Sequence, residues 1–263
     1  MVRSIYELVF DPEETYLEAF HKDRTVDEPI EICHDYKASS HLEPLLTCKQ
    51  FYNDANLLAL SRTLFVMSNP FTSQNVDRRL QERLRPDQIA SLRYFAFVAD
   101  SRHFWQLRHW KNCAFGQPLL QLAELSIILH RSSYWHYLFD FNNAVCQLMR
   151  NLQGVQRLTF VQNKSRVKGT LFTWYNRLVR LMLKTDHLER FEREQACPET
   201  SWWTWAHCPV QQTVSFTVAP AKSQVLTLID YQLLMAPMHE VLKLNIDSEE
   251  YDPDPMSRVS TGL

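Results

Sequence analysis

Glycine is scarce in this sequence: its 263 residues include only four, Gly116, Gly154, Gly169 and Gly262, although about 7% is usual. Loops that bind phosphate groups need several glycines close together, because backbone N–H groups must approach the ligand. The four glycines are too widely spaced to form such a loop. The sequence therefore excludes a Walker A loop, a dinucleotide-binding fingerprint, a kinase glycine loop and a G-x-S-x-G nucleophile elbow, and we expect no cofactor.

The sequence also lacks a long apolar run and a recognisable signal peptide. No apolar stretch approaches about 18 residues, the length at which a helix can cross a membrane, and Met1 is followed by Val-Arg-Ser-Ile-Tyr-Glu. The six cysteines are scattered, which is typical of small buried side chains in a reducing compartment. We expect a cytoplasmic or nuclear protein that is neither secreted nor embedded in a membrane.

Charge of one sign does not dominate, since the formal net charge is −2. A chain that coats nucleic acid would be strongly basic, so this balance argues against one. The charge is unevenly distributed: residues 1–40 carry net −6, residues 247–263 net −4 and residues 41–246 net +8. The acidic ends either keep the chain solvated or leave the basic central part to meet an acidic partner surface.

Short apolar windows recur along the chain, at 92–100, 122–130, 155–163 and 211–219. Each has bulky apolar residues at its fourth and sixth positions, and an earlier run fits the same frame with Leu64 and Val66. Alternating β-branched and aromatic residues predict strands. The first offsets are 31, 30 and 33 residues, which leaves room for a helix between parallel strands.

Apolar residues at helical spacing predict five helices between these windows, at 43–61, 73–85, 104–110, 134–151 and 170–194. Alternating helices and strands favour an α/β (or α+β) fold, either an irregular leucine-rich-repeat-like arc or an open, mostly parallel sheet. Gly116 and Gly154 precede predicted strands and Gly169 precedes the last helix. We expect these three glycines at chain reversals with positive φ.

The two ends of the chain depart from this pattern. Residues 15–20 and 29–36 predict a β-hairpin or two edge strands, and residues 247–263 predict a disordered acidic tail. We therefore divide the chain into an N-terminal region (1–40), an α/β repeat-like body (41–246) and the tail (247–263). Whether 225–244 forms a strand and a helix or one broken helix stays open, because Pro237 interrupts its helical pattern.

Two segments resemble a known family. Arg-Ser-Ile-Tyr-Glu-Leu-Val-Phe at 3–10 resembles the second half of an F-box-like opening motif, a Leu-Pro-x-Glu turn followed by an Arg-x-x-Ile-Tyr-Glu-Leu helix. Leu-Leu-Thr-Cys-Lys-Gln-Phe-Tyr-Asn-Asp-Ala at 45–55 is similar to the Leu-Leu-x-Thr-Cys-Arg-Gln-Ile-Tyr-x-Glu-Ala segment that follows it. The resemblance is to fungal F-box-like proteins and covers about residues 3–100.

The resemblance implies a non-enzymatic protein-interaction module. F-box proteins hold the helical adaptor of a ubiquitin ligase with the opening motif and present a substrate with the downstream domain. The Leu-Pro-x-Glu turn does not precede the first helix here. Either the opening motif is truncated here, with Ile5, Tyr6, Leu8 and Val9 as candidate contacts for a protein partner, or the remaining helix packs on the body. In the second case the chain is a scaffold that does not bind the adaptor; an unrecognised enzyme is a third alternative.

Three tryptophans, Trp202, Trp203 and Trp205, lie between Pro198 and Pro209 in what we expect to be a loop. Tryptophan is favoured at the energetic centres of protein interfaces, so these indoles are candidate anchors for a protein partner. The alternative is that the loop folds back and buries them over the sheet edge, because large exposed apolar patches are uncommon.

Other reactive side chains form no recognisable site. Cys197, His207 and Cys208 lie near one another but lack the paired spacing of zinc ligands, so we predict no metal site. Serine, histidine and aspartate residues occur in no catalytic motif, so we predict no catalytic residues. A basic stretch at 164–168, followed by Arg177 and Arg180, is either a solvated face or a contact for RNA or acidic peptide, and we expect no nucleic-acid binding.

Overall fold

The structure is a computed structural model that describes part of the chain. The described residues are 9–11, 15, 18–20, 29–67, 80, 82–99, 118–130, 145–146, 148–149, 152–165, 170–191, 202–219, 229, 233, 236 and 240. For residue 202 and residues 183–191 only the backbone is described. The predicted tail (247–263) and the predicted helix at 104–110 lie outside these residues.

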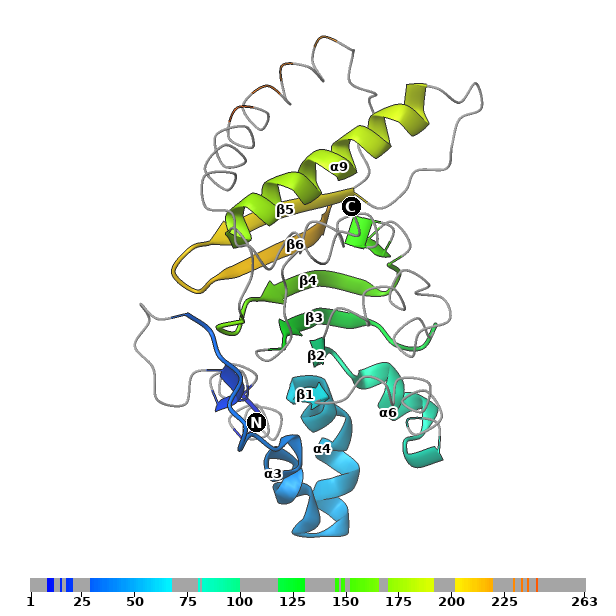
Figure 1. Ribbon diagram of the computed structural model, residues 1–263. Helices are drawn as coiled ribbons and strands as arrows, with labels where there is room; N and C mark the ends of the chain where they lie inside the picture. The colour runs from blue at the N-terminus through cyan, green and yellow to red at the C-terminus, as the bar shows by residue number, and fades with distance from the viewer. Residues whose placement is uncertain are drawn as a thin grey trace.

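The described chain forms an α/β fold around one six-stranded, mostly parallel open sheet, as predicted (Figure 1). The strands are β1 (Leu64–Met67), β2 (Tyr94–Ala99), β3 (Leu122–Leu129), β4 (Val155–Val161), β5 (Trp202–Cys208) and β6 (Thr213–Ala219). Strands β1 to β4 are parallel neighbours in chain order, β6 pairs antiparallel with β4, and β5 pairs antiparallel with β6. The last two strands therefore form a hairpin at one end of a parallel sheet.

The predicted repeat frame matches the register of β2, β3 and β4. Phe95, Leu125 and Leu158 are direct neighbours across the three strands. The frame is wrong by one residue for β1, because Phe65, rather than Leu64, lies opposite Phe95. A shift of one residue moves every side chain to the other face. All four residues of β1 are apolar, so its sequence contains no alternation that could set this phase.

Five helices have described bounds: α3 (Ala38–Leu42), the 3-10 helix η1 (Glu43–Leu46), α4 (Lys49–Arg62), α6 (Pro86–Ser91) and α9 (Leu171–Phe191). The helix predicted at 43–61 is divided at Cys48, whose extended backbone precedes α4 and whose Sγ accepts a hydrogen bond from Phe51 N. The helix predicted at 170–194 is confirmed as α9. It begins after Thr170, whose Oγ1 accepts from Thr173 N, as an N-cap does.

The main core lies on the sheet face that the helices cover. Leu60 of α4, Ile89 of α6 and Trp174 of α9 belong to one buried cluster with the strand residues of that face. Residues 145, 146, 148 and 149 are helical and buried in the same cluster. Figure 1 shows α9 beside β5 and β6, and α3 and α4 at the opposite end of the sheet near β1. Helices α4, α6 and α9 therefore pack on this face.

The predicted N-terminal hairpin is wrong. Residues 15 and 18–20 are helical, and residues 29–36, which we call the N-terminal arm, are irregular. Phe20 and Ile30 are buried in a second cluster on the opposite face of the sheet. The arm bonds to the ends of the sheet instead of to another strand: Ile30 N donates to Gln211 O, and Ile32 N donates to Asn163 Oδ1. Because these acceptors satisfy backbone N–H groups of the arm, the arm does not need a second strand as its hydrogen-bond partner.

Gly154 confirms the predicted chain reversal ahead of β4. Its φ is +71°, and an added Cβ would lie 2.6 Å from Leu120 O. Both facts require glycine, because side chains disfavour this conformation and a backbone oxygen has little room to move. Gly116 and Gly169 lie outside the described residues. Among the helices with described residues, none has the length and apolar character needed to cross a membrane.

Candidate interaction surface

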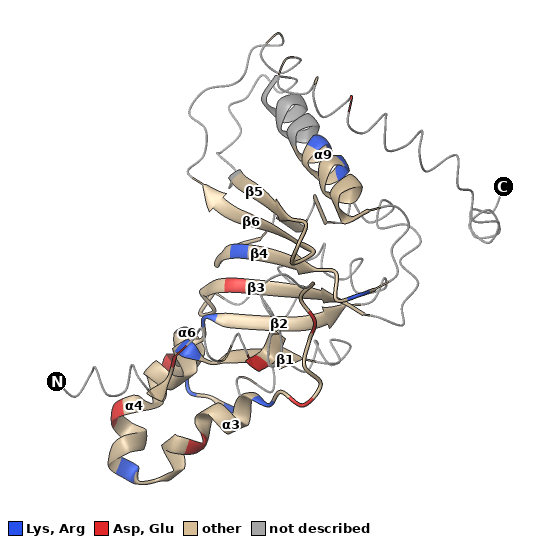
Figure 2. Ribbon diagram, turned by 90° about the vertical axis from the view of Figure 1, so that its left-hand side faces the viewer, with Lys and Arg blue, Asp and Glu red and all other residues tan. Residues whose placement is uncertain are grey.

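The face of the sheet opposite the helices carries two neighbouring rows of mostly polar side chains. Glu124, Arg157, Thr217 and Thr204 form one row across β3, β4, β6 and β5, and Ser126, Thr159, Ser215 and Ala206 form the next. We call these eight residues the polar face. Figure 2 shows the red segment of β3 next to the blue segment of β4 in the first row. Because successive strands are paired, residues from distant parts of the sequence meet here.

The N-terminal arm and the helical residues 18–20 cover the apolar part of the same sheet face and leave the polar face partly exposed. Ala96, Ile128 and Val161 are buried beneath Phe20 and Ile30. On the polar face, by contrast, Arg157, Thr204 and Ala206 are exposed. The covered part is apolar and the exposed part is polar, because burial stabilises apolar side chains but costs free energy for polar side chains that lack hydrogen-bond partners.

Glu124 is the least solvated charge on the polar face, with 17% of its side chain exposed. Its Oε1 accepts hydrogen bonds from Thr159 Oγ1 at 2.8 Å and from Ser126 Oγ at 3.3 Å. Its Oε2 lies 3.9 Å from Nη1 of Arg157, a distance at which the charges attract but no hydrogen bond forms. The carboxylate is therefore held by two hydroxyl groups and fixes the charge beside Arg157.

Sequence analysis did not single out Glu124 or Arg157, although a signal was present. They occupy the third position of their apolar windows, where the window of β2 has Tyr94. Aligning the windows by their bulky residues therefore places all three side chains in one row. Each charge taken alone looks like an ordinary solvated residue in an apolar strand. Only the strand pairing makes them neighbours.

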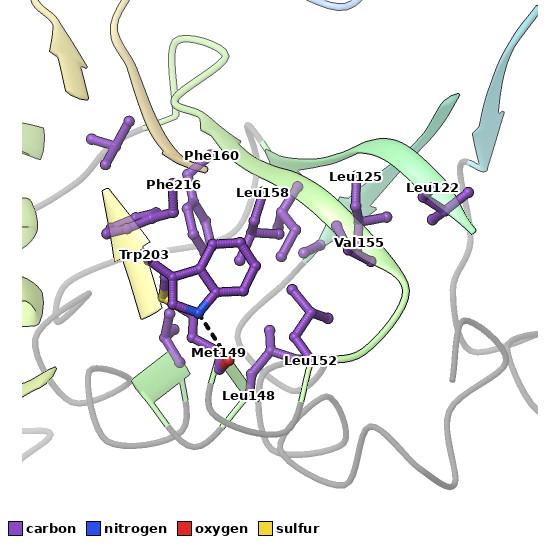
Figure 3. Packing of buried hydrophobic residues seen from close by; sticks show 14 of the residues in the cluster. Leu122, Leu125, Leu148, Met149, Leu152, Val155, Leu158, Phe160, Trp203 and Phe216 are labelled. Carbon is purple, nitrogen blue, oxygen red and sulfur yellow. Dashed lines mark hydrogen bonds between the residues drawn. The ribbon is translucent and has the colours of Figure 1, made fainter. Parts of the chain in front are cut away.

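The interpretation of Trp203 as an exposed anchor is wrong. The predicted tryptophan loop is strand β5, and Trp203 is 1% exposed. Its Nε1 donates to Met149 O at 3.1 Å, and its ring lies among Leu152, Phe160 and Phe216 (Figure 3). Aromatic residues with period-two alternation favour a strand, and the inward position buries the largest side chain. Trp205 is partly buried against the same core.

The remaining predicted partner-binding residues are Trp202 of β5 and four residues near the N-terminus. Ile5, Tyr6 and Leu8 are outside the described residues, as is the side chain of Trp202. Val9 is helical and 42% exposed. The next residue, Phe10, is 3% exposed and belongs to a third buried cluster with Ala55 and Ala59 of α4. Phe10 therefore packs on α4.

A stack of aromatic rings joins α9 to the hairpin of β5 and β6. Tyr175 and His207 stack with ring centroids 5.9 Å apart, and Phe172 lies 5.3 Å from His207. Burial raises the pKa of Tyr175 and lowers the pKa of His207, because it disfavours the charged form of each. His207 is therefore a neutral packing residue at neutral pH. In the described part of the chain no three potential ligands gather as a metal site would require; Cys197 lies outside it.

The predicted basic stretch is only partly described. Lys164 forms an ion pair with Glu31 of the N-terminal arm, although 60% of its side chain is exposed. Residues 166–168 lie outside the described residues, and Arg177 and Arg180 belong to α9. Lys164 therefore has a structural contact that holds the arm on the sheet.

A comparison of the chain with protein-family models, curated proteins and solved structures found no match.

Proposed function

We propose that this chain is a non-enzymatic protein-interaction module, related to F-box-like substrate receptors of ubiquitin ligases, and that the polar face binds its protein partner. The observation that supports the proposal most directly is the order of the strands. Because β1 to β4 are parallel neighbours in chain order, consecutive crossovers of one hand place their helices on the same face. The other face then presents side chains from successive strands to a partner.

The chemistry of the polar face also supports a binding role. Its exposed residues come from strands, which hold side chains more rigidly than loops do, so a partner would lose little entropy by ordering them. Arg157 and the hydroxyl groups beside it offer hydrogen bonds, which give an interface its specificity. The buried Thr159 and Ser126 fix Glu124 beneath this surface.

The second candidate is a scaffold that does not hold the ligase adaptor, and the burial of Phe10 favours it. Phe10 packs against α4, with its ring centroid 6.3 Å from that of Phe51. This contact buries Phe10, the last residue of the segment that resembles the opening motif, on the body of the protein. The two candidates share the polar face and differ only in whether the first helix binds the adaptor.

For its location we propose the cytoplasm or nucleus, where ubiquitin ligases act. The described cysteines Cys33, Cys48, Cys146 and Cys208 are free thiols, which supports a reducing compartment.

Affinity capture with the full chain as bait tests the proposal. The variant Thr204→Lys/Ala206→Lys adds bulk and charge to two exposed positions of the polar face, on an edge strand that tolerates lysine. Arg85→Glu is the control, because Arg85 is exposed at the start of α6. A partner retained by the control and lost by the double variant is the expected result. Partners that bind both variants equally would contradict the proposed surface.

The ligase relationship needs a separate measurement. The purified chain is titrated with recombinant ubiquitin-ligase adaptor in a calorimeter, and again after extension with any upstream coding sequence. Binding by either form supports the receptor. Binding by neither form rejects it and leaves the scaffold, which the capture experiment tests independently.

A further inference from the structure

Several hydrogen-bond donors on the exposed part of the polar face have no acceptor partner among the described residues. Arg157 has 55% of its side chain exposed, and its guanidinium makes no hydrogen bond within the part of the chain that the structure describes. The hydroxyl groups of Ser215 and Thr217, beside it on β6, also make none there. A guanidinium carries five N–H donors and no acceptor, so Arg157 can still donate hydrogen bonds to an acceptor group on a partner.

Glu124 does not supply the missing acceptor. Its Oε1 already accepts from Thr159 and Ser126, and its Oε2 is 3.9 Å from the Arg157 guanidinium. Its charge instead attracts the guanidinium and limits the directions in which it can point. The planar fork of arginine fits a carboxylate through two parallel hydrogen bonds. The guanidinium, which is half exposed and forms no hydrogen bond to Glu124, is therefore available to a second carboxylate.

The charge count decides which anion fits. Arg157 is the only cation among the eight residues of the polar face, and Glu124 offsets part of its charge. A phosphate group carries nearly two negative charges and usually requires more than one cation. A single carboxylate, flanked by the hydroxyl donors of Ser215 and Thr217, matches one guanidinium. The complementarity therefore favours an acidic side chain over a phosphorylated one.

We propose that the polar face recognises an aspartate or glutamate side chain of a partner protein, with Arg157 binding its carboxylate. This proposal rests on the proposed function, because it identifies the partner chemistry for the same surface. Arg157 contacts the partner directly, and Glu124 is a positioning residue that orients the guanidinium.

The test uses the full purified chain and a library of short random peptides, from which binders are selected and then synthesised. Each binder is compared with its Asp→Asn or Glu→Gln counterpart, and with a phosphoserine version, by fluorescence anisotropy. The chain variants are Arg157→Gln, which removes the charge, and Arg157→Lys, which keeps the charge but loses the fork. Arg85→Gln is the matched control, since its side chain is 60% exposed against 55% for Arg157. Circular dichroism confirms that each variant is folded.

The expected binders contain an acidic residue at one fixed position. Their affinity falls about 10- to 100-fold with Arg157→Gln, as expected for a hydrogen bond between charged groups, falls less with Arg157→Lys and is unchanged with Arg85→Gln. Amide substitution in the peptide causes a similar loss, and combining it with Arg157→Gln causes little more, because both remove the same interaction.

Four results would overturn the inference. Binders whose affinity does not depend on Arg157 would refute the proposed recognition of a carboxylate, but they would leave the proposed protein-interaction function intact. Binding only of phosphoserine peptides would assign the surface to phosphate. Stronger, Arg157-dependent binding of a synthetic peptide with the sequence of residues 247–256 would assign it to the chain's own acidic segment. If no peptide binds and affinity capture finds no partner that depends on the polar face, the proposed function fails together with the inference.

Discussion

Replacement of Trp203 by alanine should destabilise this protein more than replacement of Trp205. Trp203 is 1% exposed and fills the core between the sheet and the helical residues 145, 146, 148 and 149. Removal of a buried aromatic side chain costs about 3–5 kcal/mol, because apolar burial is lost and a cavity remains. Trp205 is only partly buried, so Trp205→Ala should cost less than about 2 kcal/mol.

The variant Trp203→Phe separates packing from hydrogen bonding. Phenylalanine retains most of the apolar contact but cannot donate to Met149 O, which the indole Nε1 reaches at 3.1 Å. A buried acceptor without a donor costs about 1–3 kcal/mol. The expected order of destabilisation is therefore Trp203→Ala, then Trp203→Phe, with Trp205→Ala close to or below the latter.

Equilibrium urea unfolding, followed by far-ultraviolet circular dichroism, measures these differences. With a denaturant slope of about 2 kcal/mol per molar urea, a loss of about 4 kcal/mol lowers the midpoint by about 2 M. Acrylamide quenching of tryptophan fluorescence, compared between the unaltered protein and each variant that lacks one tryptophan, reports independently whether the removed indole was accessible to solvent. If Trp203→Ala lowers the unfolding free energy by less than about 1 kcal/mol and removes a strongly quenched indole, then Trp203 is a surface anchor and the packing argument is refuted.

Three further perturbations test other parts of the structure. Gly154→Ala should lower the unfolding free energy by about 1–3 kcal/mol in urea titrations, because its φ is +71° and the new Cβ would meet Leu120 O at 2.6 Å; an unchanged midpoint would contradict this conformation. In Asn163→Gly the new glycine tolerates the φ of 55° at this position, but the side-chain acceptor of the Ile32 N–H bond is lost. Backbone hydrogen exchange in the N-terminal arm should therefore become faster. Unchanged protection would show that the side-chain amide of Asn163 does not hold the arm. Burial lowers the pKa of His207 below its usual 6.5, so the unfolded state binds more protons in mild acid and stability should fall as the pH drops below about 6.5. His207→Phe should reduce that decline in thermal melts recorded from pH 7 to pH 5, and equal declines in both proteins would contradict burial of the imidazole.

Local sequence patterns were sufficient to predict most of the parallel strands. Alternation identifies which residues of β2, β3 and β4 point into the main core, because side chains on a strand alternate between faces whatever lies beyond it. The same reasoning was not sufficient for β1, whose four apolar residues have no alternation. Gly154 was also predictable, since few residues other than glycine adopt positive φ at a chain reversal.

The candidate surface could be anticipated only in part. The aligned windows place Glu124 and Arg157 at equivalent positions, but the sequence does not show that their strands are adjacent and parallel. The predicted role of Trp203 was wrong because the choice between an exposed loop and an edge strand depends on whether β6 is there to pair with it. Likewise, the N-terminal arm forms no hairpin because the sheet face offers better burial.

The sequence by itself determined the α/β class, the positions of most strands and the absence of a glycine-rich phosphate loop, because each follows from the properties of neighbouring residues. Only the tertiary structure decided which face of β1 points into the main core, where the N-terminal arm lies and which charges become neighbours on the polar face. These depend on contacts between residues far apart in the chain. Such contacts form only when the gain from burial exceeds the entropy lost in closing the loops between them.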